Sequence, residues 1–434
     1  MSALEEVRRL APGLASGGRA SSGHSGSPAR VRSHSRKDML VTGSLRSRAW
    51  ALGAAVAATG LLAACSSAGG SASVSSVGAS ASPAGATSAG VKYAEAELAK
   101  YSGLRNTYGT PVPVSNVPDL HGKNVWYVPI GSGVPVLTTI GDAMTAALGK
   151  LGATVHVCDG KFQPTTVASC MQTAVTQGAN AVVTGFVDYN SEPSAYQSVI
   201  AKGIPVLVGG EAPPSGVSAS KDLGFFNPAG LTHTAFDLMS DAAIADSNGA
   251  ANVLVVRLTD SSDTVGNSDA GIAELQAHCP QCTVTTLDTL TANVSQLGSA
   301  ISAKLAANPA INYLILPQDA FFEAALPGIQ SAGFTDKLKV ITAGGTTAGL
   351  EAVKDGEIAY DIGQGADYNG WGFADATVRL LAGATIQPEN DGAVRVFSKA
   401  NVGSLDLTDA DYDGTVWYGG SQWQQDFLSA WGVK

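Results

Sequence analysis

Residues 172–183 read Gln172-Thr173-Ala174-Val175-Thr176-Gln177-Gly178-Ala179-Asn180-Ala181-Val182-Val183. This pattern predicts a helix over Thr165–Gln177, a turn at glycine and then a strand over Ala181–Thr184. The order repeats at once, because a predicted helix over Glu192–Lys202 is followed by a strand over Pro205–Val208. Both strands are almost entirely apolar, which is typical of a parallel sheet with helices on both faces.

The same alternation of strand and helix extends in both directions along the chain. Strands are predicted at Asn124–Ile130, Thr154–Val157 and Leu223–Phe225, and then in a second series at Asn252–Arg257, Val284–Leu287, Tyr313–Leu316, Lys339–Thr342 and Ala359–Ile362. Further helices are predicted at Val136–Leu151, Ala229–Ser247, Val265–Ala277, Val294–Ala307, Phe321–Ala332 and Thr347–Lys354. Regular alternation predicts an α/β fold, and two series predict two doubly wound parallel sheets with right-handed crossovers.

Several short strings, taken in order, resemble ribose- and galactose-type periplasmic binding proteins over roughly residues 122–385. The strings are residues 172–183, Ala201-Lys202-Gly203-Ile204-Pro205-Val206, Ala307-Asn308-Pro309-Ala310-Ile311, Leu316-Pro317-Gln318-Asp319, Gln330-Ser331-Ala332-Gly333, Lys354-Asp355-Gly356-Glu357-Ile358, Gln364 and Arg379-Leu380-Leu381-Ala382-Gly383. The resemblance implies a type I periplasmic binding protein fold, in which two lobes joined by a three-segment hinge close on a ligand. We place the first two crossovers near Gly224–Asn227 and Gly363–Gly365.

The chain is expected to divide into several parts. Residues 91–118 are expected to form an N-terminal helix and an extended lead-in. The N-terminal lobe is expected to take 119–225 with 366–400, and the C-terminal lobe 226–365 with 401–434. In open parallel sheets ligands bind beyond the carboxyl ends of the strands, so the loops after the strands are the candidate site.

Family sugar-binding sites differ from this chain at two places. After the fourth strand they typically carry an Asp-Arg pair, where this chain has Gly209-Gly210-Glu211, and after the ninth strand they carry an aromatic-Asp pair, where this chain has Ala343-Gly344-Gly345. Polar residues at the other matching positions can bond a neutral ligand, and these are Asn227, Gln318, Asp319 and Gln364. Asp319, just before an apolar helix, has the alternative interpretation of a helix N-cap.

Other candidates come from position alone. Ser132 lies in a glycine loop after the first strand, and Phe186 and Phe226 follow strand ends, where an aromatic ring can stack on a sugar or pack in the core. The carboxylates of Asp188, Glu211 and Asp319, in the absence of the family arginine, favour a cationic group on the ligand.

Leu62-Ala63-Ala64-Cys65 resembles the bacterial lipobox, so Cys65 is the predicted lipidation site and residues 1–64 the predicted signal peptide. The uncharged run Ala49–Leu62 is too short to cross a bilayer, and arginines precede it. The arginine-rich start leaves Met39 as an alternative first residue. Residues 65–90 carry no charged side chain and consist mainly of serine, alanine and glycine. This composition predicts a flexible tether.

The cysteines after Cys65 are Cys158, Cys170, Cys279 and Cys282. An even number in an exported chain predicts disulfides, and the sequence-local pairing, 158 with 170 and 279 with 282, is favoured among the possible ones. The second pair also fits a redox CxxC motif, but it follows a predicted helix rather than beginning one after a strand.

The chain lacks the motifs of common enzymes. Histidines 121, 156, 233 and 278 have no metal-ligand spacing, and the chain has neither a nucleophile elbow nor a phosphate loop, so we expect no enzyme, metal or cofactor. The net charge of −10 argues against nucleic acid. We expect a monomeric solute-binding lipoprotein on the outer face of the cell membrane, touching the membrane only through its lipid anchor and delivering a small polar ligand to an ABC permease. The alternative is a sensor of the same fold that signals to a membrane receptor.

Overall fold

The computed structural model describes residues 83–104, 108–388, 392–409 and 416–433. The predicted signal peptide, the lipidation site at Cys65 and the first part of the tether lie outside these residues. Among the described residues, no helix is both long enough and apolar enough to cross a membrane.

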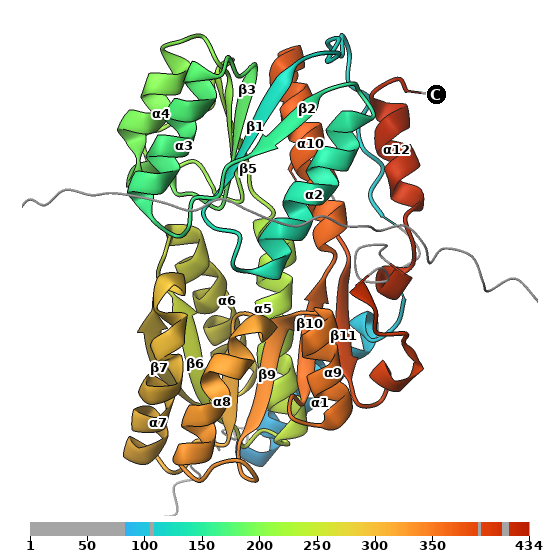
Figure 1. The fold of residues 1–434 in the computed structure, drawn as a ribbon. Helices are drawn as coiled ribbons and strands as arrows, with labels where there is room; N and C mark the ends of the chain where they lie inside the picture. The colour runs from blue at the N-terminus through green and yellow to red at the C-terminus, as the bar shows by residue number, and fades with distance from the viewer. Residues whose placement is uncertain (1–82, 105–107, 389–391, 410–415, 434) are drawn as a thin grey trace, which may run out of the picture. The chain divides into compact units, whose positions relative to one another are not determined.

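The first sheet has five parallel strands in the order β2-β1-β3-β4-β5 (Figure 1). Its strands are β1 (Asn124–Pro129), β2 (Thr154–Val157), β3 (Ala181–Gly185), β4 (Val206–Gly209) and β5 (Leu223–Phe226). Helices α3 (Pro164–Thr176) and α4 (Pro193–Ile200) pack on one face, and α2 (Pro135–Gly149) and α10 (Ala366–Ala382) on the other. Proline occupies the first turn of α2, α3 and α4, where its missing N–H costs no hydrogen bond. The predicted first series is confirmed.

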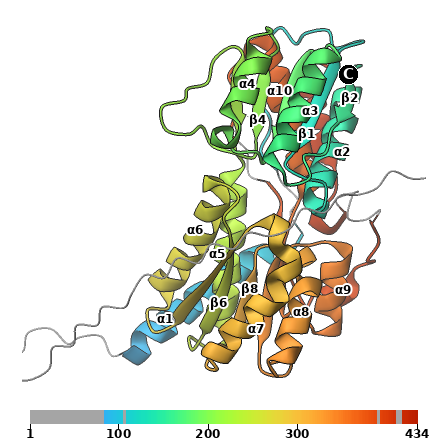
Figure 2. The same cartoon turned by 60° about the vertical axis from the view of Figure 1, so that its left-hand side comes forward.

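The second sheet has six strands in the order β11-β10-β9-β8-β6-β7, and only β11 runs antiparallel to its neighbour. Its strands are β6 (Asn252–Leu258), β7 (Thr283–Thr289), β8 (Tyr313–Leu316), β9 (Lys339–Gly344), β10 (Tyr360–Gln364) and β11 (Val394–Ser398). One face is covered by α5 (Ala229–Asp246) and α6 (Ser262–His278), and the other by α7 (Leu297–Ala307), α8 (Phe322–Ser331) and α9 (Thr347–Asp355). Figure 2 shows these two layers from the side. The predicted second series is confirmed, with β11 as an addition.

The chain passes between the lobes at the predicted places. It leaves the first sheet after β5 and enters α5 at Asn227–Pro228, and it returns from β10 to α10 at Gly365. A third passage joins α10 to β11 over residues 383–393. The terminal helices add further passages, because α1 (Pro83–Tyr101) packs on the second lobe and α12 (Gln422–Ala430) on the first. The three predicted hinge segments are therefore present, and the terminal helices add connections to them.

The predicted lobe boundaries are wrong at the C-terminal end. The expected N-terminal-lobe segment 366–400 includes β11, but β11 pairs with β10 of the second sheet along Tyr360–Gln364. The expected C-terminal-lobe segment 401–434 includes α12, but Trp423, Phe427 and Trp431 pack on Trp371 of α10 in the first lobe. The spacing of four residues between these aromatics places them on one face of a helix, which is the signal that sequence reasoning missed.

The predicted tether and helix boundary is also wrong, because α1 begins at Pro83 rather than Val91. The residues after Pro83 are rich in alanine, the strongest helix former. Val91 and Ala94 are buried against α5, and the ring of Tyr93 stacks on His278 with centroids 3.7 Å apart. The last part of the predicted tether, from Pro83 onward, therefore belongs to a helix that packs on the second lobe.

Both predicted disulfides are present. Cys158, just after β2, bonds Cys170 of α3 with Cα atoms 5.7 Å apart, and Cys279 bonds Cys282 in the turn between α6 and β7. Cys279 is fully buried. Each bridge ties a helix to a strand of its own lobe, and neither joins the two lobes.

Substituting Gly90 with valine is expected to detach α1 from the second lobe. A Cβ atom at position 90 would lie only 1.8 Å from the carbonyl oxygen of His278, so we expect a loss of about 1–3 kcal/mol in stability and faster amide exchange along α1. Exchange mass spectrometry and thermal unfolding measure both effects. Ala89→Val, at an exposed neighbouring position, is the matched control, and equal protection of α1 in the two variants would contradict the predicted docking.

Candidate functional site

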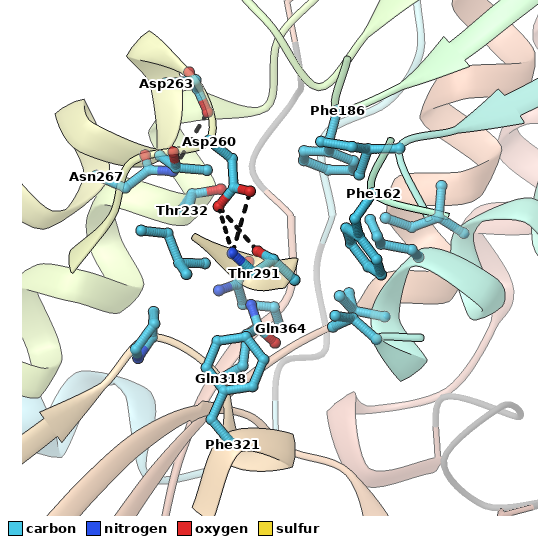
Figure 3. A pocket seen from close by; sticks show the side chains of 18 of the residues that line it. Phe162, Phe186, Thr232, Asp260, Asp263, Asn267, Thr291, Gln318, Phe321 and Gln364 are labelled. Carbon is cyan, nitrogen blue, oxygen red and sulfur yellow. Dashed lines mark hydrogen bonds between the residues drawn. The ribbon is translucent and has the colours of Figure 1, made fainter. Parts of the chain in front are cut away.

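A cavity of about 120 Å³ lies where the carboxyl ends of the strands of both sheets meet (Figure 3). Its volume is below the roughly 300–1,000 Å³ of pockets for drug-sized ligands, which favours a compact ligand. Both lobes line it: Ile130, Val134, Val136, Leu137, Ile140, Phe162, Phe186 and Asn369 come from elements of the first lobe, and Thr232, Phe236, Leu258, Asp260, Asp263, Thr264, Asn267, Thr291, Pro317, Gln318, Phe321 and Gln364 from the second.

The wall of the first lobe is apolar except for Asn369, and it carries two phenylalanines in an uncommon backbone conformation. Phe162 has φ 54° and Phe186 has φ 58°, in the left-handed region that non-glycine residues seldom adopt. The backbone N–H of Phe162 donates to the carbonyl of Ile130 at 2.7 Å, and that of Phe186 donates to the carbonyl of Gly209 at 2.7 Å. Such conformations cluster at ligand sites, where the surrounding structure enforces them.

Glycines make room for these two rings. A Cβ atom on Gly131 would lie 2.4 Å from the ring of Phe162, and one on Gly210 would lie 2.6 Å from the ring of Phe186. Gly210 therefore has a packing role beneath Phe186.

The wall of the second lobe is mostly polar. Asp260 follows β6 and accepts hydrogen bonds from Thr291, at 3.1 and 3.2 Å from the backbone nitrogen and 2.9 Å from the hydroxyl. This contact joins the loop after β6 to the loop after β7. Ser261 then caps α6 in a capping box with Thr264, so the helix starts at a defined residue and presents Asp263 and Asn267 to the cavity.

Asp263 is held by two neutral amides. The side-chain nitrogen of Asn227 donates to Oδ1 at 3.0 Å, and that of Asn267 donates to Oδ2 at 3.3 Å. Burial raises the pKa of Asp263, while these two hydrogen bonds and His233 act in the opposite direction.

Two buried amides have acceptor atoms without a hydrogen-bond partner. Asn267 of α6 is 6% exposed and Asn369 of α10 is 5% exposed, and the Oδ1 atom of each is unpaired. They line the cavity from different lobes. Since buried acceptors are normally satisfied, each of these two oxygens lacks the donor that a buried amide oxygen usually has.

Glu211 lies close to this acidic wall without lining it. It is 2% exposed. Burial raises its pKa to about 8, and the charge of Asp263 is the second-largest cause of the rise. Asp188 and Asp260 add to the rise, and the hydroxyl of Ser261 opposes it.

The predicted site residues fall into two groups. Phe186, Gln318 and Gln364 line the cavity, and their contact with a ligand stays a prediction. Asn227 and Glu211 are behind the lining. Asn227 bonds Asp263, and the charge of Asp263 raises the pKa of Glu211.

The other predicted residues do not line the cavity. Ser132 is exposed and its backbone N–H bonds Asp159 at 3.0 Å, while Asp188 accepts from the backbone of Asn190 at 2.7 Å. Phe226 is buried in the first lobe with its ring 5.4 Å from that of Phe373. Contact of these three residues with a ligand stays a prediction.

Asp319 is also placed away from the cavity, and it has no N-cap role. Its Oδ2 accepts from the backbone and hydroxyl of Thr346 at 2.8 and 2.7 Å. It faces the fully buried Asp361, whose pKa is raised well above its usual value by burial and by the charge of Asp319. The two carboxyls thus hold the loop after β9, so Asp319 supports the fold of the second lobe.

Sequence reasoning missed Phe162, Asp260, Asp263, Asn267 and Asn369. A usable signal was the string Thr259-Asp260-Ser261-Ser262-Asp263, which puts two carboxylates directly after a buried strand. The asparagines carry no such signal, because only tertiary packing decides which face of a helix meets the other lobe. Within the described part of the chain, no group of three or more histidine, cysteine or acidic side chains could hold a metal ion.

Glu211→Gln is expected to remove a pH dependence of stability. The pKa rises from 4.5 to about 8 on folding, so the folded protein keeps a proton that the unfolded chain releases, and stability falls as pH rises through this window. Glutamine stays neutral at every pH. The melting temperature of the variant should therefore be a few degrees above that of the wild type at pH 8.5 and equal to it at pH 4.5. Thermal unfolding across pH measures this; the exposed Glu323→Gln is the control, and superimposable profiles for Glu211→Gln and wild type would contradict it.

The fold is shared with solved structures of solute-binding proteins. An ABC sugar transporter subunit from Rhodobacter sphaeroides is 20% identical, with a TM-score of 0.56, over 65% of this chain and 100% of its own. An Agrobacterium vitis ABC transporter solute-binding protein with bound allitol is 20% identical, with a TM-score of 0.55, over 65% of this chain and 98% of its own. A Caulobacter myo-inositol binding protein is 18% identical, with a TM-score of 0.57, over 69% of this chain and 98% of its own.

No curated protein matches the chain in sequence. The model of one family, described as "Periplasmic binding protein domain", matches residues 125–385. These residues hold both sheets up to α10, including the strand ends that line the cavity. The chain therefore belongs to the periplasmic binding protein domain family, whose members are binding proteins rather than enzymes.

Proposed function

We propose that this protein is the extracytoplasmic solute-binding lipoprotein of an ABC importer, and that it captures a small sugar or sugar-like molecule between its lobes. The observation that carries the proposal is the cavity itself, which is lined from both lobes at the carboxyl edges of both sheets. A ligand that contacts both walls binds the closed form more tightly than the open one and so shifts the protein toward closure.

The chemistry of the lining supports a polar, hydroxylated ligand. Gln318 and Gln364 offer amides that both donate and accept, and Asn369 offers an unpaired acceptor. Phe162, Phe186 and Phe321 offer ring faces for the apolar side of such a molecule. The related structures described as binding allitol and myo-inositol hold ligands of this kind.

The lipid anchor belongs to the same proposal. The lipobox-like string ending at Cys65 precedes the residues that the structure describes. The helix α1, the first described element, packs on the second lobe. An acyl chain on Cys65 would then hold the binding lobes beside a permease, with only the segment before α1 as a tether.

A sugar or polyol that occupies the cleft is expected to raise the melting temperature. At a concentration of roughly 100 times its dissociation constant, a ligand adds about 2.7 kcal/mol to the free energy of unfolding. Screening monosaccharides, polyols and their amino derivatives by thermal shift, followed by calorimetry of the best ligand, measures this.

Gln364→Ala tests the position of the site in the same assay. Loss of one hydrogen bond should weaken binding about three- to tenfold, whereas Gln425→Ala, at an exposed position of α12, should bind as the wild type does. A screen without any stabilising ligand, or equal affinity of Gln364→Ala and wild type, would argue against the proposed site.

A further inference from the structure

We propose that the ligand of this cleft carries a protonated amine on a small hydroxylated frame, and that Asp263, supported by Asp260, provides its counter-charge. This inference rests on the proposed function and narrows it to one class of ligand. It differs from the sequence-based expectation of a cationic group, because Asp188 and Asp319, two of the carboxylates that motivated that expectation, are not at the cavity.

The first observation is the charge of the lining. The residues that line the cavity include the carboxylates Asp260 and Asp263 and no lysine or arginine. Glu211 lies within electrostatic reach of both, and His233 is the titratable nitrogen group that acts on Asp263. The wall is therefore acidic without a basic partner inside the cavity.

The second observation is how Asp263 is bonded. Its two oxygens accept from the amides of Asn227 and Asn267 at 3.0 and 3.3 Å. Amide donors satisfy the lone pairs of a carboxylate but leave its net charge in place, and a buried charge without a counter-charge is unfavourable. An ammonium group in the cavity removes that cost, whereas a hydroxyl group does not.

The third observation is independent of charge. The unpaired Oδ1 atoms of Asn267 and Asn369 belong to side chains that are more than nine-tenths buried and line the cavity from α6 and α10. An ammonium carries three donors and no acceptor, so it can bond several such atoms without bringing an acceptor that itself needs a partner. Acceptors from both lobes would then bond the same ligand.

The fourth observation is the opposite wall. Figure 3 shows Phe162 and Phe186 across the cavity from Asp263 and Asn267. Aromatic faces attract cations as well as the apolar faces of sugars. A hydroxylated ring with one primary amine, such as an amino sugar or an aminocyclitol, combines these features within a small volume.

Calorimetry with matched pairs at neutral pH tests the proposal. Glucose, galactose and mannose are each compared with the sugar that bears an amine at carbon 2, and myo-inositol is compared with an inositol amine. Because charge-assisted hydrogen bonds are about twice as strong as neutral ones, the amine of at least one pair should bind about tenfold or more tightly than its neutral partner. Equal or tighter binding of the neutral member in every pair that binds would overturn the inference.

Asp263→Asn identifies the counter-charge. This nearly isosteric change should weaken binding of the amine about tenfold or more, and by a clearly larger factor than it weakens binding of the neutral partner. Asp269→Asn, an exposed position on the same helix, is the control and should bind the amine as the wild type does. If Asp263→Asn does not fold, Asp260→Asn replaces it, with the same expected selectivity for the charged ligand; unchanged amine affinity would overturn the assignment.

The outcomes separate the two proposals. If neutral sugars or polyols bind and amines hold no advantage, the inference fails and the proposed function stands. If neither series binds, the proposed function itself fails and the inference with it. Preference for the amine that disappears in Asp263→Asn supports both.

Discussion

The parallel arrangement of the strands is the constraint on which the site depends. Parallel strands place all their carboxyl ends at one edge of a sheet, and here both sheets turn that edge to the same cavity. Because the chain crosses at Asn227–Pro228 and again at Gly365, each immediately after a strand, the connections lie beside the ligand site. Residues that start the crossovers, such as Asn227 and Gln364, therefore influence both the hinge and the site.

The two walls divide the chemistry between them. The first lobe supplies the rings of Phe162 and Phe186, which a left-handed backbone and nearby glycines hold in place. The second lobe supplies carboxylates on rigid positions, with α6 capped just before Asp263 and the loop of Asp260 bonded to Thr291. A wall prepared in this way has little ordering cost on binding, so in the proposed function lobe closure is the main change on ligand capture.

Much of this architecture could be predicted from the amino-acid order. Buried parallel strands are apolar runs, so the strands of both sheets could be predicted. Gln318, after β8, and Gln364, at the end of β10, line the cavity, and their contact with a ligand stays a prediction. Side chains on helices were not predictable in the same way. Asp263 and Asn369 reach the cavity only because their helices are oriented by packing, and Asp319 turns to Thr346 because Asp361 and the loop after β9 are beside it. The lobe membership of β11 depends on its pairing with β10. The aromatic spacing in α12 indicates a buried helix face but not the lobe on which that face packs.

The central claim is that one ligand joins the two lobes, and the distance between the lobes measures it most directly. Spin labels at the exposed positions Ser132 in the first lobe and Asn293 in the second report that distance by pulsed electron resonance, since the described cysteines are all in disulfides. The account predicts that a ligand found by screening shortens the distance and narrows its distribution, and that Gln364→Ala requires more ligand for the same change. An identical distance distribution with and without saturating ligand would contradict it.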